Sequence, residues 1–434
     1  MAFRVCARFF RDSAVLSGRV AAAARRESAS WPPASGNRGG QNGFIVSPAR
    51  LIASEAFVER QSGTAAEPDG SFCRPPASLP PDSSQHMSLF LRNPDQPDNS
   101  KVLKIAIIGS PNAGKSTLSN QLLGRKVFAV SKKVHTTRCS ALGVLTEDDT
   151  QMIILDTPGL TTASKVKRHH LESSLLVDPW NSVKEADLLV VMVDVSDKWT
   201  RNRLDMELLK CLAHHPDVPA ILVLNKVDCI KAKDRLLSIT AELTCGMVNG
   251  HRIGSSPGRR TASSPDEDDG GHEGSAESKS APSKEQLKAL KSQGGWPRFK
   301  DIFMLSAVDK EDVDTLKSYF MAEAKPGSWQ YHSEVLTSQS PEDVCTNAIR
   351  EKLLEHLSEE VPYSISQFID YWHEGENSEL LISVKLYTKK SRHVGFVVGT
   401  AGEMVNRIAR EAGEDLSSLF QRNVTLKLSV RMKN

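Results

Sequence analysis

The segment GSPNAGKST at residues 109–117 has the clearest chemistry in this 434-residue chain. It matches the pattern GxxxxGK[ST], follows a short apolar run and opens a predicted helix, Thr117–Leu123. In this arrangement the backbone N–H groups of the loop and of the helix N-terminus cradle phosphates. Lys115 would reach the β- and γ-phosphates, and the Ser116 hydroxyl would ligate Mg²⁺. The predicted phosphate-binding residues are Gly109, Ser110, Pro111, Asn112, Ala113, Gly114, Lys115, Ser116 and Thr117.

Three more motifs follow in the order that a guanine-nucleotide site requires. In the segment DTPG, Asp156 can hold the Mg²⁺ shell through water and the Gly159 N–H can sense the γ-phosphate. In NKVD, the Asp228 carboxylate can accept from guanine N1–H and the 2-amino group, a donor pair that adenine lacks. One such motif alone could be an ordinary turn, but all of them together at strand ends favour a nucleotide site. The further nucleotide-binding residues are Asp156, Thr157, Pro158, Gly159, Asn225, Lys226, Asp228, Ser306 and Ala307, the last pair offering a backbone N–H to guanine O6.

A second candidate site is a GxxG loop near the C-terminus. It lies between two predicted helical segments, Val394–Val398 and Glu403–Ala412. Such a loop lets the backbone approach four nucleotides of a single strand. From Lys385 onward the chain has ten Lys and Arg against four Asp and Glu, which is typical of a phosphate-binding surface. A GxxG alone is more often a plain turn, so this interpretation depends on the surrounding domain. The candidate RNA-binding residues are Lys389, Lys390, Arg392, Gly399, Thr400, Ala401 and Gly402.

Alternating strands and helices position the nucleotide motifs. Short apolar runs predict buried strands, and helical stretches such as Arg203–Ala213 lie between them. This alternation predicts a parallel, doubly wound α/β sheet with each motif at the carboxyl end of a strand. The predicted strands are Val102–Gly109, Met152–Leu155, Leu188–Val193, Ala220–Leu224 and Asp301–Leu305.

The C-terminal part predicts a small α+β domain. Ser340 and Pro341 provide a helix N-cap and a first-turn proline, and an apolar stripe follows until Pro362 ends the helix. The remaining segments complete the order α-β-β-α-α-β. They are two alternating strands at Ile365–Tyr371 and Leu380–Tyr387, a glycine-punctuated helical region at Gly395–Gly413, and a last strand at Val424–Val430.

The order GSPNAGKST, HTTR, DTPGL, NKVD and SA resembles the Era family of GTPases, in a mitochondrial form. The resemblance implies a P-loop G domain and a type II KH domain, with GTP or GDP and Mg²⁺ as ligands. It assigns residues 101–330 to the G domain and 334–434 to the KH domain. It also implies that Thr137 completes the Mg²⁺ shell beside Ser116 and Asp156. The catalytic residues carried over are Lys115, Thr137, Gly159 and Asn112.

Leu160 departs from Ras-like GTPases, which place a water-orienting Gln after DxxG. GTPases that resemble this chain commonly use a monovalent cation, usually K⁺, held partly by the P-loop Asn, which is Asn112 here. The alternative is that Leu160 packs under switch II and hydrolysis is slow. A second departure lies in the GxxG loop, where Thr400 and Ala401 occupy positions at which KH loops often carry Lys or Arg. We therefore expect weaker phosphate contact from that loop itself.

Composition separates the N-terminal region and one insertion from the folded domains. The first thirty residues hold six Arg, no Lys and two acids, which is typical of a mitochondrial presequence. A disordered basic tail is the alternative. We assign residues 1–45 to the presequence, 46–100 to a disordered lead-in and 246–297 to a disordered insertion within the G domain.

The remaining bulk features bound the class of protein. The chain has no run of 18 apolar residues that would predict a membrane span. Its seven scattered cysteines lack the spacing of a zinc site or a disulfide framework. The predicted location is the mitochondrial matrix, with peripheral association with the inner membrane left open.

Three functions compete. The leading hypothesis is a GTP-hydrolysing, RNA-binding switch. By resemblance it binds the 3′ region of small-subunit rRNA of the mitochondrial 12S type, chaperones assembly of the small ribosomal subunit, and is a monomer. The alternative is a structural RNA-binding protein whose nucleotide site turns over little. A P-loop kinase or ATPase is disfavoured by NKVD and by the lack of an acceptor-binding lid.

Overall fold

The computed structural model describes residues 51–52, 77–131, 141–157, 159, 180, 182–253, 292–358 and 360–433. The presequence and three predicted site residues, Thr137, Pro158 and Leu160, lie outside these ranges. None of the helices within the ranges has the length and apolar composition needed to cross a membrane.

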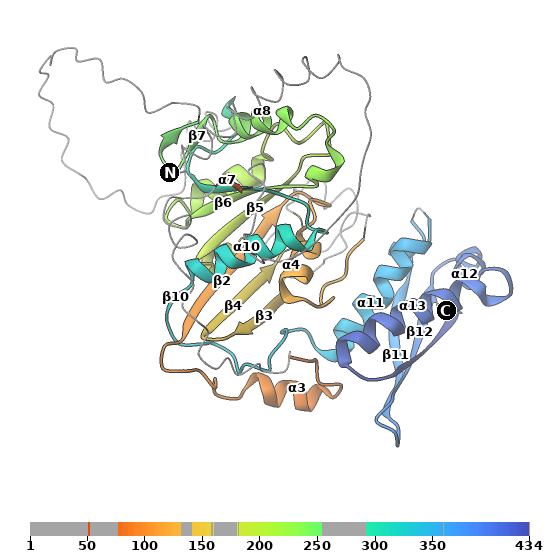
Figure 1. The fold of residues 1–434 in the computed structure, drawn as a ribbon. Helices are drawn as coiled ribbons and strands as arrows, with labels where there is room; N and C mark the ends of the chain where they lie inside the picture. Colours follow the sequence, from red (N-terminus) through yellow and green to blue (C-terminus); the bar gives the residue numbers. More distant parts are fainter. Residues whose placement is uncertain are drawn as a thin grey trace, which may run out of the picture.

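The N-terminal domain is built on a twisted sheet (Figure 1). Within the described residues this sheet has eight strands in the order β1-β9-β6-β5-β2-β4-β3, with β10 pairing to β2. Strands β9, β6, β5, β2 and β4 run parallel, while β3, β1 and β10 pair antiparallel at its margins. The strands are β1 Leu51–Ile52, β2 Lys101–Gly109, β3 Ala141–Glu147, β4 Thr150–Asp156, β5 Leu188–Asp194, β6 Ala220–Asn225, β9 Phe299–Leu305 and β10 Lys325–Pro326.

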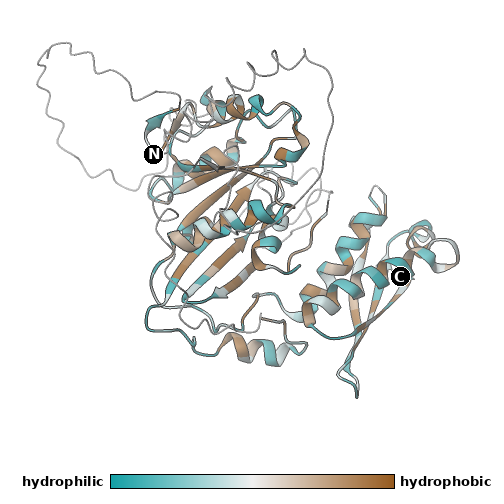
Figure 2. Ribbon diagram, in the orientation of Figure 1, coloured by the Kyte–Doolittle hydropathy of each residue, from teal (hydrophilic) through white to brown (hydrophobic). Residues whose placement is uncertain are grey.

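Helices cover both faces of this sheet, which confirms the doubly wound fold. Helices α4 (Lys115–Leu123) and α10 (Lys310–Glu323) pack against one face, where Ile105 and Ile107 are fully buried. Helices α7 (Met206–His214) and α8 (Asp234–Leu243) pack against the other face, where the alternate residues of β2 point. Figure 2 shows the apolar strands enclosed between helices whose outer surfaces are polar.

The C-terminal domain has the predicted order α-β-β-α-α-β. Ser340 caps its first helix by accepting a hydrogen bond of 3.1 Å from the Asp343 N–H. The sheet has the order β11-β12-β13, with β11 antiparallel and β13 parallel to the central strand. The elements are α11 Pro341–His356, β11 Ser366–Glu374, β12 Leu380–Thr388, α12 Ser391–Val398, α13 Glu403–Phe420 and β13 Val424–Met432, with 3₁₀ turns at Pro362–Ser364 and Thr400–Gly402.

The prediction of a disordered lead-in over 46–100 is wrong for residues 77–100. They form helix α3 (Ser83–Phe90) and an extended strap, with Leu79 buried. His86 Nε2 lies 3.0 Å from the Thr337 carbonyl oxygen, and the Trp372 indole N–H donates to the Pro81 carbonyl at 2.9 Å. The strap therefore contacts both the interdomain linker and the C-terminal domain.

Two boundaries also differ from the predictions. The insertion predicted at 246–297 begins with a short hairpin, β7 (Met247–Val248) and β8 (His251–Arg252), and Trp296 near its end is buried in the core. The helix predicted from Arg203 begins only at Met206, because the Asp205 side chain caps it by accepting from the Glu207 N–H at 2.9 Å.

Candidate functional site

The phosphate loop joins the end of β2 to the start of α4, as predicted. The Lys115 side chain is buried and donates to the Ser110 and Gly109 carbonyl oxygens at 3.0 and 3.3 Å. Burial lowers the pKa of Lys115 to about 8, while the nearby Asp156 carboxylate acts in the opposite direction. A phosphate beside the ammonium group would favour its charged form.

A hydroxyl and a carboxylate at the start of α4 suit a magnesium ion. The Ser116 hydroxyl donates to Asp156 Oδ2 at 2.8 Å, and the Ser119 hydroxyl donates to Oδ1 of the same carboxylate at 3.2 Å. Asp156 is fully buried at the end of β4. Oxygen ligands of this kind are those that Mg²⁺ prefers, so Ser116 and Asp156 fit the predicted metal role.

The DTPG motif reaches the phosphate loop at Gly159. A Cβ atom at this position would lie 2.8 Å from the Pro111 backbone nitrogen, closer than real Cβ contacts allow. Glycine is therefore required for the close approach of residue 159 to the phosphate loop. Thr157 is anchored behind it, because its hydroxyl donates to the Ile107 carbonyl at 2.7 Å.

Asn225 connects the NKVD motif with the phosphate loop and with the Ser306–Ala307 turn. Its Nδ2 donates to the Ala113 carbonyl at 2.7 Å, and its Oδ1 accepts from the Ala307 N–H at 2.8 Å. Lys226 donates to the Asn112 carbonyl at 2.9 Å and pairs with Asp194 at the end of β5. Sequence reasoning missed Asp194, although its position at a strand end was a usable signal.

Asp228 is the residue predicted to read the base. It lies in the exposed 3₁₀ turn Val227–Cys229 directly after β6. A hydrogen bond from the Ser306 side chain is the main cause that holds its pKa below the ordinary value, so Asp228 is ionised at neutral pH. An ionised carboxylate accepts from two donors at once, as guanine recognition requires.

A cavity of about 1500 Å³ runs from the phosphate loop toward the C-terminal domain. Its lining includes Ser110–Asn112, Gly114–Thr117 and Gly159 on one side and residues of α11 on the other. Asp228 and Ser306 do not line it. The phosphate end of the site therefore faces the second domain.

The GxxG loop has the geometry that close backbone contact requires. Gly399 has φ +72°, and a Cβ there would lie 2.7 Å from the Met404 Cβ, so glycine is required on both counts. Thr400 and Ala401 are exposed at the tip, between α12 and α13. Lys389, Lys390 and Arg392 are exposed where β12 passes into α12.

Comparison with known proteins identifies both parts. Residues 104–226 match the 50S ribosome-binding GTPase family, and residues 360–434 match the KH domain family. The chain is 59% identical to the mitochondrial GTPase Era of Salmo salar over the full length of both proteins. It is 58% identical to that of Danio rerio, covering 90% of this chain and 88% of that protein. The chain belongs to the Era family of GTPases. It is a mitochondrial form of that family, and it hydrolyses GTP.

The fold agrees with a solved Era. A crystal structure of Era in complex with MgGDPNP and nucleotides 1506–1542 of 16S ribosomal RNA superposes with a TM-score of 0.57 at 25% identity. It covers 77% of this chain and 94% of the solved one. Guanine nucleotide and Mg²⁺ are thus ligands of this GTPase, as the sequence predicted.

In this Era GTPase a buried carboxylate joins the KH domain to residues 126–130, which precede the predicted switch I. Glu351 of α11 is 4% exposed and accepts from the Val130 N–H at 2.8 Å. Lys126 Nζ lies 2.6 Å from a carboxylate oxygen of Glu351 and 2.6 Å from one of Asp415 on α13. The same segment is fixed to α4, because the Asn120 side chain bonds both the N–H and the carbonyl of Phe128 at 2.8 Å. We call Lys126, Val130, Glu351 and Asp415 the interdomain clamp.

Lys126→Met should weaken this clamp. The change leaves Glu351 buried without its nearest cation, and burial already raises the pKa of this carboxyl. Since Lys126 is partly exposed, we expect the free energy of unfolding to fall by about 1–3 kcal/mol. Denaturant unfolding in a double-mutant cycle with Glu351→Gln measures the pair, and Lys198→Met, at an exposed lysine, is the matched control. Additive losses in the double variant would show that the pair does not couple.

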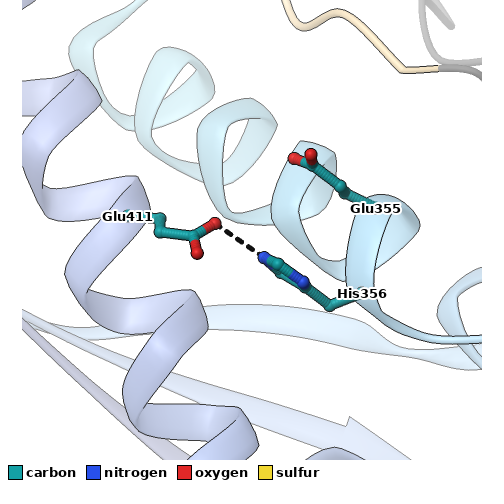
Figure 3. Close-up of side chains that lie close together, drawn as sticks. All are labelled: Glu355, His356 and Glu411. Atoms are coloured by element: carbon teal, nitrogen blue, oxygen red, sulfur yellow. Dashed lines mark hydrogen bonds and ion pairs between the residues drawn. The ribbon is translucent and has the colours of Figure 1, made fainter.

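A second cluster links α11 to α13 inside the KH domain (Figure 3). His356 Nε2 lies 2.6 Å from Glu411 Oε2, and this bond is the main cause that lowers the pKa of Glu411. Together with Glu355 these side chains are the one group among the described residues that could hold a metal ion. Lys352 Nζ lies 3.5 Å from Glu355 and 3.9 Å from Glu411, so a cation already sits among the carboxylates. We interpret the cluster as a helix-to-helix ion pair.

Proposed function

We propose that this Era GTPase is a GTP-driven RNA-binding switch that chaperones assembly of the mitochondrial small ribosomal subunit. Its RNA is the 3′ region of the 12S-type small-subunit rRNA, bound by the KH domain of a monomer. The observation that carries the proposal is the clamp, because Glu351 connects the KH domain to the residues that lead into switch I. The 16S rRNA segment in the solved Era complex supports the choice of RNA.

The switch has a physical basis in the clamp. When the γ-phosphate orders switch I around Thr137, the segment 126–131 that leads into it changes position or rigidity. The clamp transmits that change to α11 and α13, and the GxxG loop lies directly before α13. Because coupling between binding sites is reciprocal, RNA binding should change GTP affinity by the same factor that GTP changes RNA affinity.

Two measurements test the proposal. Crosslinking and sequencing of RNA bound to the full chain should recover the 3′ end of the small-subunit rRNA, more strongly with a non-hydrolysable GTP analogue than with GDP. Single-turnover GTP hydrolysis with and without that RNA separates a switch from a structural protein with little turnover. Equal RNA recovery with the GTP analogue and with GDP, together with GTP hydrolysis that RNA does not accelerate, would favour the structural alternative.

We further propose that K⁺ assists hydrolysis beside Asn112. This residue lines the cavity and has φ +62°, so Asn112→Gly keeps the backbone conformation and removes the side-chain oxygen. We expect faster GTP hydrolysis in K⁺ than in Na⁺ at equal ionic strength, and no difference between the salts in the variant. Equal hydrolysis rates in K⁺ and Na⁺ for the unmodified chain would favour the alternative that Leu160 only packs under switch II.

The matrix is the proposed location, with residues 1–45 as the targeting segment. A fluorescent reporter that carries this segment should enter mitochondria and become resistant to external protease. Changing Arg4, Arg8 and Arg11 to Glu should prevent import, while changing them to Lys keeps the charge and is the matched control. Import of the Glu variant would show that the basic face is not the signal.

A further inference from the structure

The KH sheet has one covered face and one open face. Along β12 the residues Leu380, Ile382, Val384 and Leu386 are buried against the helices, while the residues between them are only partly covered. Figure 1 shows α11, α12 and α13 gathered around this sheet. The partly covered side chains therefore belong to a second surface, which we call the open sheet face. It carries Phe368, Tyr371 and His373 of β11, Leu381, Ser383, Lys385 and Tyr387 of β12, and Thr425, Lys427, Ser429 and Arg431 of β13.

A β-bulge places two aromatic rings on the open sheet face. Phe368 and Tyr371 are three residues apart, so a regular strand would direct them to opposite faces. The register of β11 shifts between Ile369 and Tyr371, and both rings are exposed, at 59% and 50%. Bulges often re-aim side chains at functional sites. The Tyr371 and His373 rings lie 5.8 Å apart, which extends the row of aromatic side chains.

Cations alternate with these rings across the sheet. Phe368 lies opposite Lys385, Tyr371 opposite Ser383, and Ser383 opposite Lys427. Tyr387 in turn lies opposite Arg431. Asp370 is the acidic residue of the bulge, and it is paired with Lys385. The open sheet face also carries Ser383, Ser429 and Thr425, whose side chains are small.

A basic edge connects this face to the GxxG loop. Strands β12 and β13 are parallel and end together, with the Lys433 N–H donating to the Thr388 carbonyl at 2.9 Å. This brings Arg431 and Lys433 next to Lys389 and Lys390, which lead into α12 and the loop. A nucleic-acid strand leaving the loop would pass this basic edge before reaching the aromatic rings.

We propose that the open sheet face is a second binding surface for single-stranded RNA, on which bases stack on Phe368 and Tyr371. The inference rests on the proposed function and extends it from the GxxG loop to a longer RNA segment. Every base has a π-face, so exposed rings interleaved with cations bind single strands with little dependence on sequence. Both rings lie on β11, and their partners on β12, Lys385 and Ser383, are two residues apart. The rings are therefore about 7 Å apart along the sheet, which spaces them as separate stacking positions.

The composition favours RNA over a protein partner. A stable protein interface has an apolar, water-free centre. Here the centre consists of Ser383, Lys385 and Ser429, and the apolar side chains are separate aromatic rings with Leu381 toward one end. Three cations against one paired acid complement a polyphosphate chain.

The test measures the affinity of the full chain for fluorescent oligouridylates of about 5 and about 20 nucleotides, because the loop alone contacts about four nucleotides. In the Phe368→Ala/Tyr371→Ala variant, affinity for the longer RNA should fall about tenfold or more, while affinity for the shorter RNA should stay within about twofold. Ultraviolet crosslinking of the longer RNA should label β11 in the unmodified chain. Trp199→Ala, at an exposed ring of the G domain, is the matched control and should bind both RNAs normally.

Unchanged affinity of the double variant for the longer RNA would overturn the proposal. If that variant kept its RNA affinity but lost binding to purified small ribosomal subunits, the face would be assigned to a protein contact instead. The loop variant Thr400→Asp/Ala401→Asp distinguishes failure of the open-sheet-face proposal from failure of the proposed function. Loss of RNA binding there alone would leave the proposed function intact, whereas no loss in either variant would overturn both.

Discussion

Asp228→Asn is expected to change the nucleotide preference of this GTPase from GTP to XTP. The predicted role of the carboxylate is to accept two hydrogen bonds from guanine, whereas an Asn side chain would present a donor to the 2-amino group. Removing two bonds to a charged group costs about 3–6 kcal/mol, which is about two to four orders of magnitude in GTP affinity. XTP carries an acceptor at position 2, so the new amide donor compensates with that base.

The measurement is the affinity for GTP and XTP by nucleotide competition in both proteins. Asp234→Asn, at an exposed carboxylate in the first turn of α8, is the matched control and should leave both affinities unchanged. The Ser306 hydroxyl bonds the Asp228 side chain, so Ser306→Ala should weaken GTP binding in the same direction by a smaller amount. A variant at 228 that still preferred GTP would remove this residue from base reading.

The nucleotide site could be predicted because each part carries its own local signal. Asp156 and Asn225 end buried strands, and Ser306 directly follows one. Parallel strands bring their carboxyl ends to one edge of the sheet. The structure adds the contacts between those motifs. That one Asn225 side chain would bond both Ala113 and Ala307 does not follow from any spacing in the sequence.

Features held by distant contacts could not be predicted. Residues 77–100 are rich in polar residues and proline, which is typical of disorder, yet contacts such as those of His86 with Thr337 and Trp372 with Pro81 order them. Glu351 belongs to the same class. A glutamate on a helix is usually solvated, and only the packing of α11 against residues 126–130 buries this one.

The bulge at Asp370 shows a different limit of prediction from sequence, which is the register of a strand. The alternating pattern of β11 predicts a strand, and the structure confirms one, but the face on which each residue lies depends on a register shift of one residue. Without the structure, Phe368 and Tyr371 are assigned to opposite faces. The open sheet face therefore becomes recognisable only when the register is known.

Thr400→Asp/Ala401→Asp is expected to weaken RNA binding about 100-fold while GTP affinity stays unchanged. Both residues are exposed at the tip of the loop, so two carboxylates there would meet the RNA phosphates. Substituting Gly399 instead would also disturb Met404 and confuse RNA loss with misfolding. Asp tolerates the φ of +51° at position 401 better than most residues do. Preventing the close backbone approach to phosphate should cost about 3 kcal/mol or more, about 100-fold in affinity.

A charge-matched control separates the local effect of the loop substitutions from a general change in the electrostatic field of the domain. Asn377→Asp/Ser378→Asp adds the same two charges at the exposed β11–β12 turn, which Figure 1 shows at the far end of the KH domain from α12. RNA affinity should change little in this control, especially above about 0.1 M salt, where exposed charges are screened beyond about 10 Å.

Neutralising Lys389, Lys390 and Arg392 should act differently from the loop variant. These exposed cations precede α12 and would contact phosphates without reading bases. Affinity for all single strands should fall alike, and the slope of log affinity against log salt should flatten by about 0.7 for each phosphate that is no longer neutralised. Sequence preference, measured with two RNAs of different sequence, should persist in this triple variant.

Unchanged RNA affinity in the Thr400→Asp/Ala401→Asp protein, across the same salt series, would contradict the prediction for the loop. It would mean that the loop does not bind the RNA and that the proposed switch lacks its RNA-binding site.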